Sequence, residues 1–166
     1  IIMNISGNTQ SILKAERLVL NCMQQMSAIA TKTNNISKKI SSTNTKILDT
    51  RKTIPLNRKI QKWAVKIGGG KNHRFALDDM IMIKDNHIDY CGGISQAIKK
   101  TKIYLKQNNL NLDIVVETRN IKEIKEVINE GGIKRILLDN FNFDDTRNAV
   151  KIIDNKFETE SSGGIT

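Results

Sequence analysis

From residue 46 onward, short apolar segments alternate with longer amphipathic segments along this 166-residue chain. Aliphatic residues fill the short segments at 46–48, 80–83, 114–116 and 136–138, and a weaker one lies at 156–159. Between them, apolar residues recur at helical spacing over 57–67, 95–107, 121–129 and 146–153. Parallel strands need a crossover helix between them, so this alternation predicts an α/β fold with a parallel sheet.

Charged residues stand at the ends of the predicted strands, namely Asp49, Lys84, Glu117 and Asp139. In parallel α/β architectures the active site lies at the carboxyl edge of the sheet. The chain lacks an early G-x-G-x-x-G, which a dinucleotide-binding open sheet usually carries. We therefore expect a (β/α) barrel, or part of one, in preference to an open doubly wound sheet.

The first 45 residues have a different pattern. Residues 8–33 carry an apolar stripe at helical spacing, with Asn8 or Thr9 as the cap, and a second, more polar helix is predicted over 35–42. We expect two regions, a helical segment at 1–45 and an incomplete α/β-barrel domain at 46–166.

Three short cationic segments lie between residues 47 and 87: DTRKT, GKNHRF after a triple glycine, and IKDNH. Arg51 and Arg74 can each bind a carboxylate or phosphate with two parallel hydrogen bonds, and Lys52, His73 and Lys84 add donors. If these segments converge, they predict a pocket for a small ligand with several anionic groups. The alternatives are solvated loops, a helix cap at the glycines and a turn at Asp85–Asn86. His87 is expected to be structural.

Glu117 and Asp139 close successive predicted strands. Two carboxylates facing one pocket can hold Mg²⁺, bind sugar hydroxyls or stabilise an oxocarbenium-like centre. A strand-end cap or an ion pair is the alternative. Ser161 to Gly164 can bind phosphate through hydroxyl and backbone N–H groups, although Ser-Gly clusters are also common loops.

The net charge of +10 and the pI of about 9.7 raise the possibility of nucleic-acid binding. The basic residues are spread along the chain, and aromatic residues, at 4%, do not alternate with them. These features favour lysines on solvated helix faces over a nucleic-acid interface. Two cysteines without a C-x-x-C pattern indicate a reducing compartment such as the cytoplasm. No apolar run approaches the ~20 residues of a membrane span.

The chain resembles the quinolinate phosphoribosyltransferase family, the carboxylating nicotinate-nucleotide pyrophosphorylases. The matching strings occur in the family's order: GNTQSILKAERLVLN, SAIATKT, ILDTRKT, KWAVKIGGGKNHRF, IKDNHI, ILLDNF and ESSGGI. The resemblance implies phosphoribosyl transfer from phosphoribosyl pyrophosphate to quinolinate, with loss of CO₂ and formation of nicotinate mononucleotide in NAD biosynthesis. It implies Mg²⁺ with the pyrophosphate, no organic cofactor and no nucleic-acid or membrane partner.

By position, the resemblance implies roles for individual residues. Arg51, His73 and Arg74 would bind the two carboxylates of quinolinate, and Thr50 would lie beside them. Arg17 would reach the site of a neighbouring subunit in a homodimer, or in a hexamer built from dimers. Lys52 and Lys84 would contact the anionic groups of the two substrates. Glu117 and Asp139 would face the ribose and Mg²⁺, and the 5′-phosphate would be held by Ser162, Gly163 and Gly164. Lys84, Glu117 and Asp139 would be the catalytic residues.

The chain also departs from the family pattern. The usual Gly-Leu after DTRKT-x-Pro is Leu56-Asn57 here, and the usual Glu-Val-Glu is Val115-Val116-Glu117. Family members have an α/β domain before the long helix and further barrel strands after ESSGG, so the chain is expected to be a central fragment or a degraded copy. Two other functions stay open: a related pyrophosphorylase with another acceptor, and a non-enzymatic basic fragment that binds polyanions.

Overall fold

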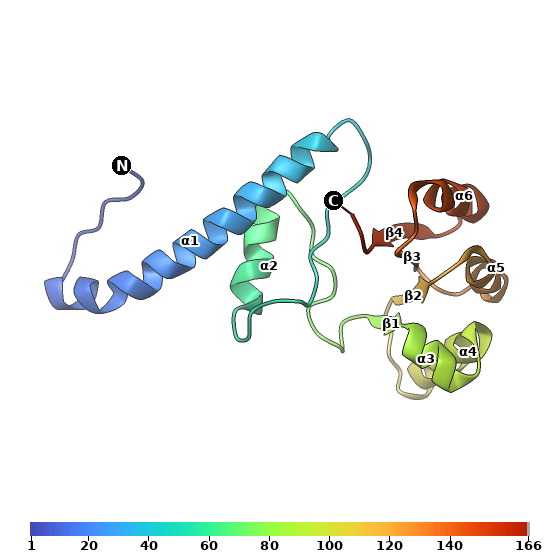
Figure 1. Cartoon of the computed structure of the whole chain (residues 1–166). Coiled ribbons are helices and arrows are strands. Elements are labelled where there is room, and N and C mark those ends of the chain that lie inside the picture. Colours follow the sequence, from blue (N-terminus) through green and yellow to red (C-terminus); the bar gives the residue numbers. More distant parts are fainter. Residues whose placement is uncertain (166) are drawn as a thin grey trace. The chain divides into compact units, whose positions relative to one another are not determined.

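A computed structural model describes residues 1–165. The chain divides into two compact units, Ile1–Ala76 and Leu77–Thr166. The first holds helices α1 (Thr9–Lys39) and α2 (Arg58–Ile67). The second holds four strands and four helices, in the order β1 (Ile81–Ile83), α3 (Asp85–Cys91), α4 (Ile94–Gln107), β2 (Ile114–Thr118), α5 (Ile121–Glu130), β3 (Arg135–Asp139), α6 (Phe143–Ile153) and β4 (Glu158–Ser162) (Figure 1).

Helix α1 is a single helix of 31 residues. Its start is capped by Asn8, whose side chain accepts a hydrogen bond from the Ser11 backbone N–H at 3.1 Å. No glycine or proline interrupts the segment, and Lys38 and Lys39 lie in the last turn, where cations stabilise the helix dipole. The prediction of a separate helix at 35–42 was therefore wrong, because nothing in the sequence breaks α1 before Ile40.

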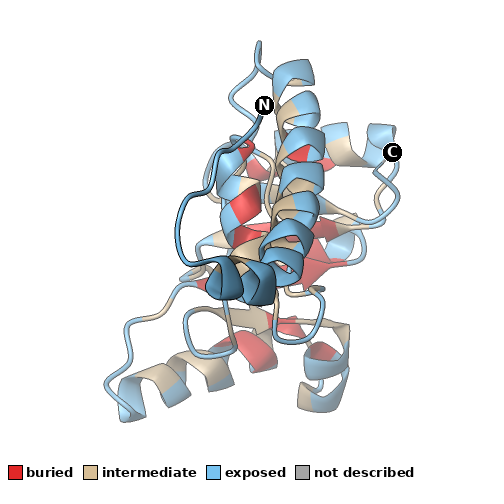
Figure 2. Cartoon of the chain, turned by 90° about the vertical axis from the view of Figure 1, so that its left-hand side faces the viewer, coloured by how far each residue is buried: buried red, intermediate tan, exposed pale blue. Residues whose placement is uncertain are grey.

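The unit Ile1–Ala76 is built on contacts between α1 and α2. Ala64 of α2 and Thr33 of α1 are buried, whereas most of α1 is coloured exposed or intermediate in Figure 2. The predicted strand at 46–48 is absent: within residues 1–165 this segment makes one parallel bridge, between Leu48 and Lys71. Two apolar residues, Ile47 and Leu48, do not make a strand when a single bridge to Lys71 is the pairing that they form within residues 1–165.

The unit Leu77–Thr166 contains one parallel sheet whose strands follow the chain order, β1-β2-β3-β4. Right-handed crossovers between strands in this order place every connecting helix on the same face. Figure 1 shows α4, α5 and α6 together on that face. The strand order lacks the reversal of a doubly wound sheet, so the predicted α/β architecture with barrel-type connections is confirmed.

The hydrophobic core of this unit fills the space between the sheet and its helices. Strand residues Ile114, Val116, Ile136 and Leu138 pack there with residues from the helices, which include Ile98, Ile124 and Ile153. Successive side chains in a strand point to opposite faces, so Glu117, Leu137 and Asp139 belong to the face away from the helices. The helix α3 after β1 was not predicted, because Asp85 and Asn86 are also typical turn residues.

None of the helices within residues 1–165, including the long α1, is apolar enough over its length to cross a bilayer.

Candidate active site

Two of the predicted cationic segments pair with each other in the first unit. The Asp49 backbone N–H donates to the Lys71 carbonyl at 3.1 Å, and the Lys71 N–H donates to the Ile47 carbonyl at 2.8 Å. In the first segment Arg51 and Lys52 come shortly after Asp49, and in the second His73 and Arg74 come shortly after Lys71. This pairing brings together the DTRKT and GKNHRF segments, two of the three cationic segments of the sequence.

Asp49 connects these segments through its side chain. It forms an ion pair with Lys62 of α2, and its Oδ1 accepts the His73 backbone N–H at 2.8 Å. The side chains of Lys62 and Asp49 are only 2% and 6% exposed. A buried ion pair of this kind is a strong constraint, because loss of one partner leaves an uncompensated charge.

The polar atoms of Arg51 and His73 differ in their hydrogen bonding. The Arg51 Nε is buried and has no hydrogen-bond partner within residues 1–165. His73 Nδ1 accepts the Arg74 backbone N–H at 2.7 Å, so the proton of a neutral His73 ring is on Nε2. Thr50 and Lys52 are exposed, and the Thr50 hydroxyl accepts the Lys52 N–H at 2.9 Å. Arg17 is exposed on α1.

The triple glycine before these residues packs against α1. A Cβ on Gly68 would lie 2.4 Å from the Ala30 carbonyl oxygen, and one on Gly70 would lie 3.0 Å from the Thr33 methyl. Gly69 has a φ of +90°, which side chains rarely adopt. Close packing of the chain on α1 thus explains the glycines, a reason that the sequence alone did not indicate.

In the second unit, Lys84 and Glu117 form an ion pair across the carboxyl ends of β1 and β2. Lys84 Nζ lies 2.8 Å from Glu117 Oε2, and the side chains are 45% and 10% exposed. The Lys84 backbone N–H also donates to His87 Nδ1 at 2.9 Å, which gives His87 the structural, capping role expected for it. A cation and a carboxylate from neighbouring strands are therefore in direct contact at the predicted edge.

Asp139 and the Ser162 turn lie at the same edge of the sheet. Asp139 pairs in register with Ser162, and Glu117 with Leu137. Gly163 and Gly164 follow with φ values of +77° and +63°. The carboxyl ends of parallel strands thus gather Lys84, Glu117 and Asp139 along one edge, as predicted, with Ser162 beside Asp139. Asp49 was also expected at a strand end, but it follows no strand within residues 1–165.

Arg135 occupies the opposite end of β3. Its Nη1 donates to Glu160 and its Nε to Glu158, each at 2.9 Å. Burial lowers the pKa of the Arg135 guanidinium, but the hydrogen bonds to Glu158 and Glu160 outweigh burial and hold that pKa above its ordinary value. On the neighbouring strand β2, Val115 pairs in register with Arg135 and is fully buried.

Val115 stands where the family pattern usually has Glu. An apolar residue at this buried position avoids the cost of burying another charge.

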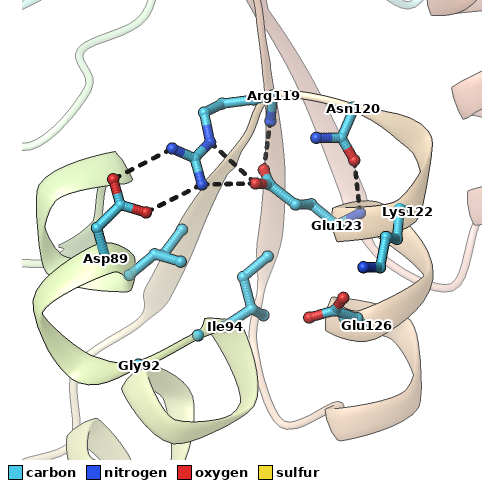
Figure 3. Close-up of a pocket in the computed structure, with 10 residues that line it drawn as sticks. Asp89, Gly92, Ile94, Arg119, Asn120, Lys122, Glu123 and Glu126 are labelled. Atoms are coloured by element: carbon cyan, nitrogen blue, oxygen red, sulfur yellow. Dashed lines mark hydrogen bonds and ion pairs between the residues drawn. The ribbon is translucent and has the colours of Figure 1, made fainter.

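A pocket of about 430 Å³ lies beside α3, α4 and α5 and holds none of the predicted site residues (Figure 3). Arg119 crosses it, with Nε 2.9 Å from Glu123 Oε1 and Nη2 3.2 Å from Asp89 Oδ1. The hydrogen bonds to Glu123, then those to Asp89, raise the pKa of the guanidinium. Because each charge in this network is already paired, Arg119 joins the end of β2 to α3 and α5 structurally.

The carboxylates at the sheet edge suit Mg²⁺ chemically, since hard cations prefer oxygen ligands. Within the described residues, however, no three His, Cys, Asp or Glu side chains cluster closely enough to hold an ion. Glu117 is also occupied by Lys84. These residues fit a metal that takes most of its ligands from a bound polyanion and water, as Mg²⁺ commonly does.

Two contributors to this geometry were missed from the sequence. Lys62 is buried although periodicity places lysines at the surface, so no sequence signal marked it. Asn140, directly after Asp139, donates from Nδ2 to the Asp139 carboxylate at 2.8 Å. Its position at a predicted strand end was a usable signal, but amides at such positions are also ordinary turn residues.

Comparisons with known proteins agree on one family. The family described as quinolinate phosphoribosyl transferase, C-terminal domain, matches residues 29–166. The chain is 48% identical to the chloroplastic carboxylating nicotinate-nucleotide pyrophosphorylase of Arabidopsis thaliana, over 98% of this chain and 50% of that protein. It is 41% identical to a Bacillus subtilis protein named probable carboxylating nicotinate-nucleotide pyrophosphorylase, over 100% of this chain and 56% of that protein.

A solved structure shows the same similarity. The nicotinate-nucleotide pyrophosphorylase of Francisella tularensis matches with a TM-score of 0.88 and 45% identity, over 96% of this chain and 55% of that one. The chain thus spans about half the length of the relatives that it matches.

Proposed function

Because this chain belongs to the quinolinate phosphoribosyltransferase family, we propose that its protein transfers a phosphoribosyl group from phosphoribosyl pyrophosphate to quinolinate. The products are nicotinate mononucleotide, pyrophosphate and CO₂, in NAD biosynthesis. The observation that carries the proposal is the hydrogen-bonded pairing of the segments that bear Arg51 and His73, through Asp49. A rigid cationic group of this kind suits a small planar dianion.

Each group of residues has its own task in the proposed reaction. Arg51, His73 and Arg74, with Thr50 beside them, bind the carboxylates of quinolinate. Lys52 and Lys84 bind anionic oxygens. Ser162, Gly163 and Gly164 bind the 5′-phosphate through hydroxyl and N–H groups. The two glycines have positive φ values, and turns of left-handed backbone are among those whose N–H groups bind anions.

The carboxylates act on the ribose. The quinolinate ring nitrogen forms a bond to ribose C1 as the bond from C1 to pyrophosphate breaks, and positive charge develops at C1. Glu117 and Asp139 stabilise this charge and orient the ribose hydroxyls. With the ring nitrogen quaternised, the adjacent carboxylate leaves as CO₂ and the carbon takes up a proton. Bound Mg²⁺ would offset the charge of the leaving pyrophosphate, with Glu117 and Asp139 near it through substrate or water.

We also propose the assembly and the compartment. Residues 1–45, with α1, form a homodimer interface, supported by the exposed apolar residues Leu13 and Leu18 around Arg17. The free cysteines Cys22 and Cys91 support a reducing compartment, the cytoplasm. Among the relatives, the Arabidopsis protein is named chloroplastic and a tobacco protein mitochondrial.

The function is tested with the full-length protein, quinolinate, phosphoribosyl pyrophosphate and Mg²⁺, by following nicotinate mononucleotide. We expect turnover of quinolinate and about 100-fold weaker binding of nicotinate, which lacks one carboxylate. Lys84→Ala is expected to lower kcat/KM about 100-fold, because it removes a cation and leaves Glu117 unpaired. The matched control is Lys134→Ala, which breaks an exposed 2.6 Å pair with Asp113.

Preference for nicotinate would assign another acceptor to the site. Nucleic-acid affinity that falls steeply with salt, without binding of quinolinate, would replace the enzyme by a polyanion-binding protein.

A shared site in the dimer predicts complementation between two inactive variants. Arg17→Ala and Lys84→Ala, mixed in equal amounts and allowed to exchange subunits, should recover about a quarter of the wild-type activity, since half the dimers then hold one intact site. The control is Lys14→Ala, an exposed cation one turn earlier on α1, which should be active alone. A mixture that stays at the level of its parents would place Arg17 outside the site.

A further inference from the structure

Asn140 connects the Asp139 carboxylate at the end of β3 with Ser162 at the end of β4. Its side-chain Nδ2 donates to Asp139 Oδ2 at 2.8 Å, and its backbone N–H donates to the Ser162 carbonyl at 2.8 Å. The residue has a φ of 55°, in the left-handed region that asparagine tolerates better than most side chains. One residue thus contacts the Asp139 carboxylate with its amide and the following strand with its backbone.

The other side of the same amide lies against Gly163. A Cβ built on Gly163 would be 2.1 Å from Asn140 Oδ1 and 2.6 Å from its Cγ. The amide orientation is defined by its partner, because a carboxylate accepts hydrogen bonds and would repel Oδ1. The turn at Gly163 therefore has no room for any side chain while Asn140 keeps its bond to Asp139.

We propose that Asn140 is a positioning residue that holds the Asp139 carboxylate and the turn of Ser162–Gly164 at a fixed separation. This inference rests on the proposed function, in which Asp139 meets the ribose and the turn meets the 5′-phosphate. The ribose and its 5′-phosphate are covalently joined, so both contacts form together only if the protein holds the two subsites rigidly. In this proposal Asn140 acts on the substrate through Asp139 and the turn, which it contacts.

The proposal separates ligands that need both subsites from ligands that need one. Ribose 5-phosphate spans Asp139 and the turn, whereas inorganic phosphate uses the turn alone. In the full-length protein, Asn140→Gly should weaken ribose 5-phosphate about tenfold, because Asp139 and the turn are then no longer held in place before the ligand binds. The affinities for inorganic phosphate and for quinolinate should stay within about twofold of the wild-type values. Neither ligand needs Asp139 and the turn to be held at a fixed separation. Calorimetric titration measures all three.

Glycine is the chosen replacement because it adopts the left-handed backbone readily and removes the side chain that carries the amide. Asn155→Gly is the matched control: Asn155 has a φ of 57° and is exposed in the turn before β4. It should leave all three affinities unchanged. Thermal unfolding of both variants reports any general loss of structure, which would weaken every ligand alike.

A second measurement tests the contact with Gly163. Gly163→Ala should cost more in the wild-type background than in Asn140→Gly, where the clashing amide is absent, when each is titrated with ribose 5-phosphate. Equal costs in the two backgrounds would overturn the contact. An unchanged ratio of ribose 5-phosphate to phosphate affinity in Asn140→Gly would overturn the positioning role. If Asn140→Gly changes this ratio but the wild-type protein does not use quinolinate, the positioning role stands and only the acceptor in the proposed function is refuted.

Discussion

Lys62→Ala is expected to lower the free energy of unfolding by about 3–5 kcal/mol, the range found when one partner of a buried ion pair is removed. Asp49 would keep its charge at 6% exposure without the Lys62 ammonium. Its other hydrogen-bond donors, the His73 backbone N–H and the Asn72 side-chain amide, supply no full charge. Urea unfolding followed by circular dichroism measures the change.

Two variants sharpen this test. Lys59→Ala removes an exposed lysine from the same helix and should change stability by less than about 0.5 kcal/mol. The double change Asp49→Asn with Lys62→Met should be at least ~1 kcal/mol more stable than Lys62→Ala, because the amide oxygen still accepts the His73 N–H and no buried charge is left. A Lys62→Ala protein as stable as the Lys59→Ala control would show that the pair is not buried in solution.

Arg51→Ala is expected to lower the affinity of the full-length protein for quinolinate about 100-fold, or about 2.7 kcal/mol. The Arg51 Nε is buried without a hydrogen-bond partner among residues 1–165, and such a donor costs free energy until an acceptor reaches it. A ligand carboxylate would supply that acceptor. The affinity is measured by isothermal titration.

Arg51→Lys should retain part of the affinity, because lysine keeps the charge but not the planar fork of donors. Arg147→Ala is the matched control, since Arg147 is an exposed guanidinium paired with Asp144 on α6. A loss of less than about threefold in Arg51→Ala, roughly 0.7 kcal/mol, would exclude Arg51 from the carboxylate site.

The parallel sheet was predictable because its strands are short and apolar and its helices strongly amphipathic. A strand buried on the helix side needs aliphatic residues such as Ile114 and Val116. A charged residue at or next to the end of β1, β2 and β3 marks where the chain leaves the core. The edge that gathers Lys84, Glu117 and Asp139 follows from this pattern, since parallel strands end on one side. The family resemblance added roles to these residues that spacing alone did not distinguish from caps or ion pairs.

Other features depended on contacts between residues distant in the sequence. Within residues 1–165 the segment at 46–48 forms no strand, because only Lys71 pairs with it. The triple glycine reflects the close approach of the chain to Ala30 and Thr33 of α1. Asp85 and Asn86 begin α3, with His87 bonded to the Lys84 N–H, although the same residues also suit a turn.

The sequence by itself therefore determined the class of fold, the order of its elements and the charged residues at the sheet edge, because hydrophobic periodicity is a local property. Only the tertiary structure decided that Lys62 neutralises Asp49 and that Asn140 fills the space beside Gly163. Burial and side-chain contact arise from segments brought together by folding, and no local pattern of residue types records them.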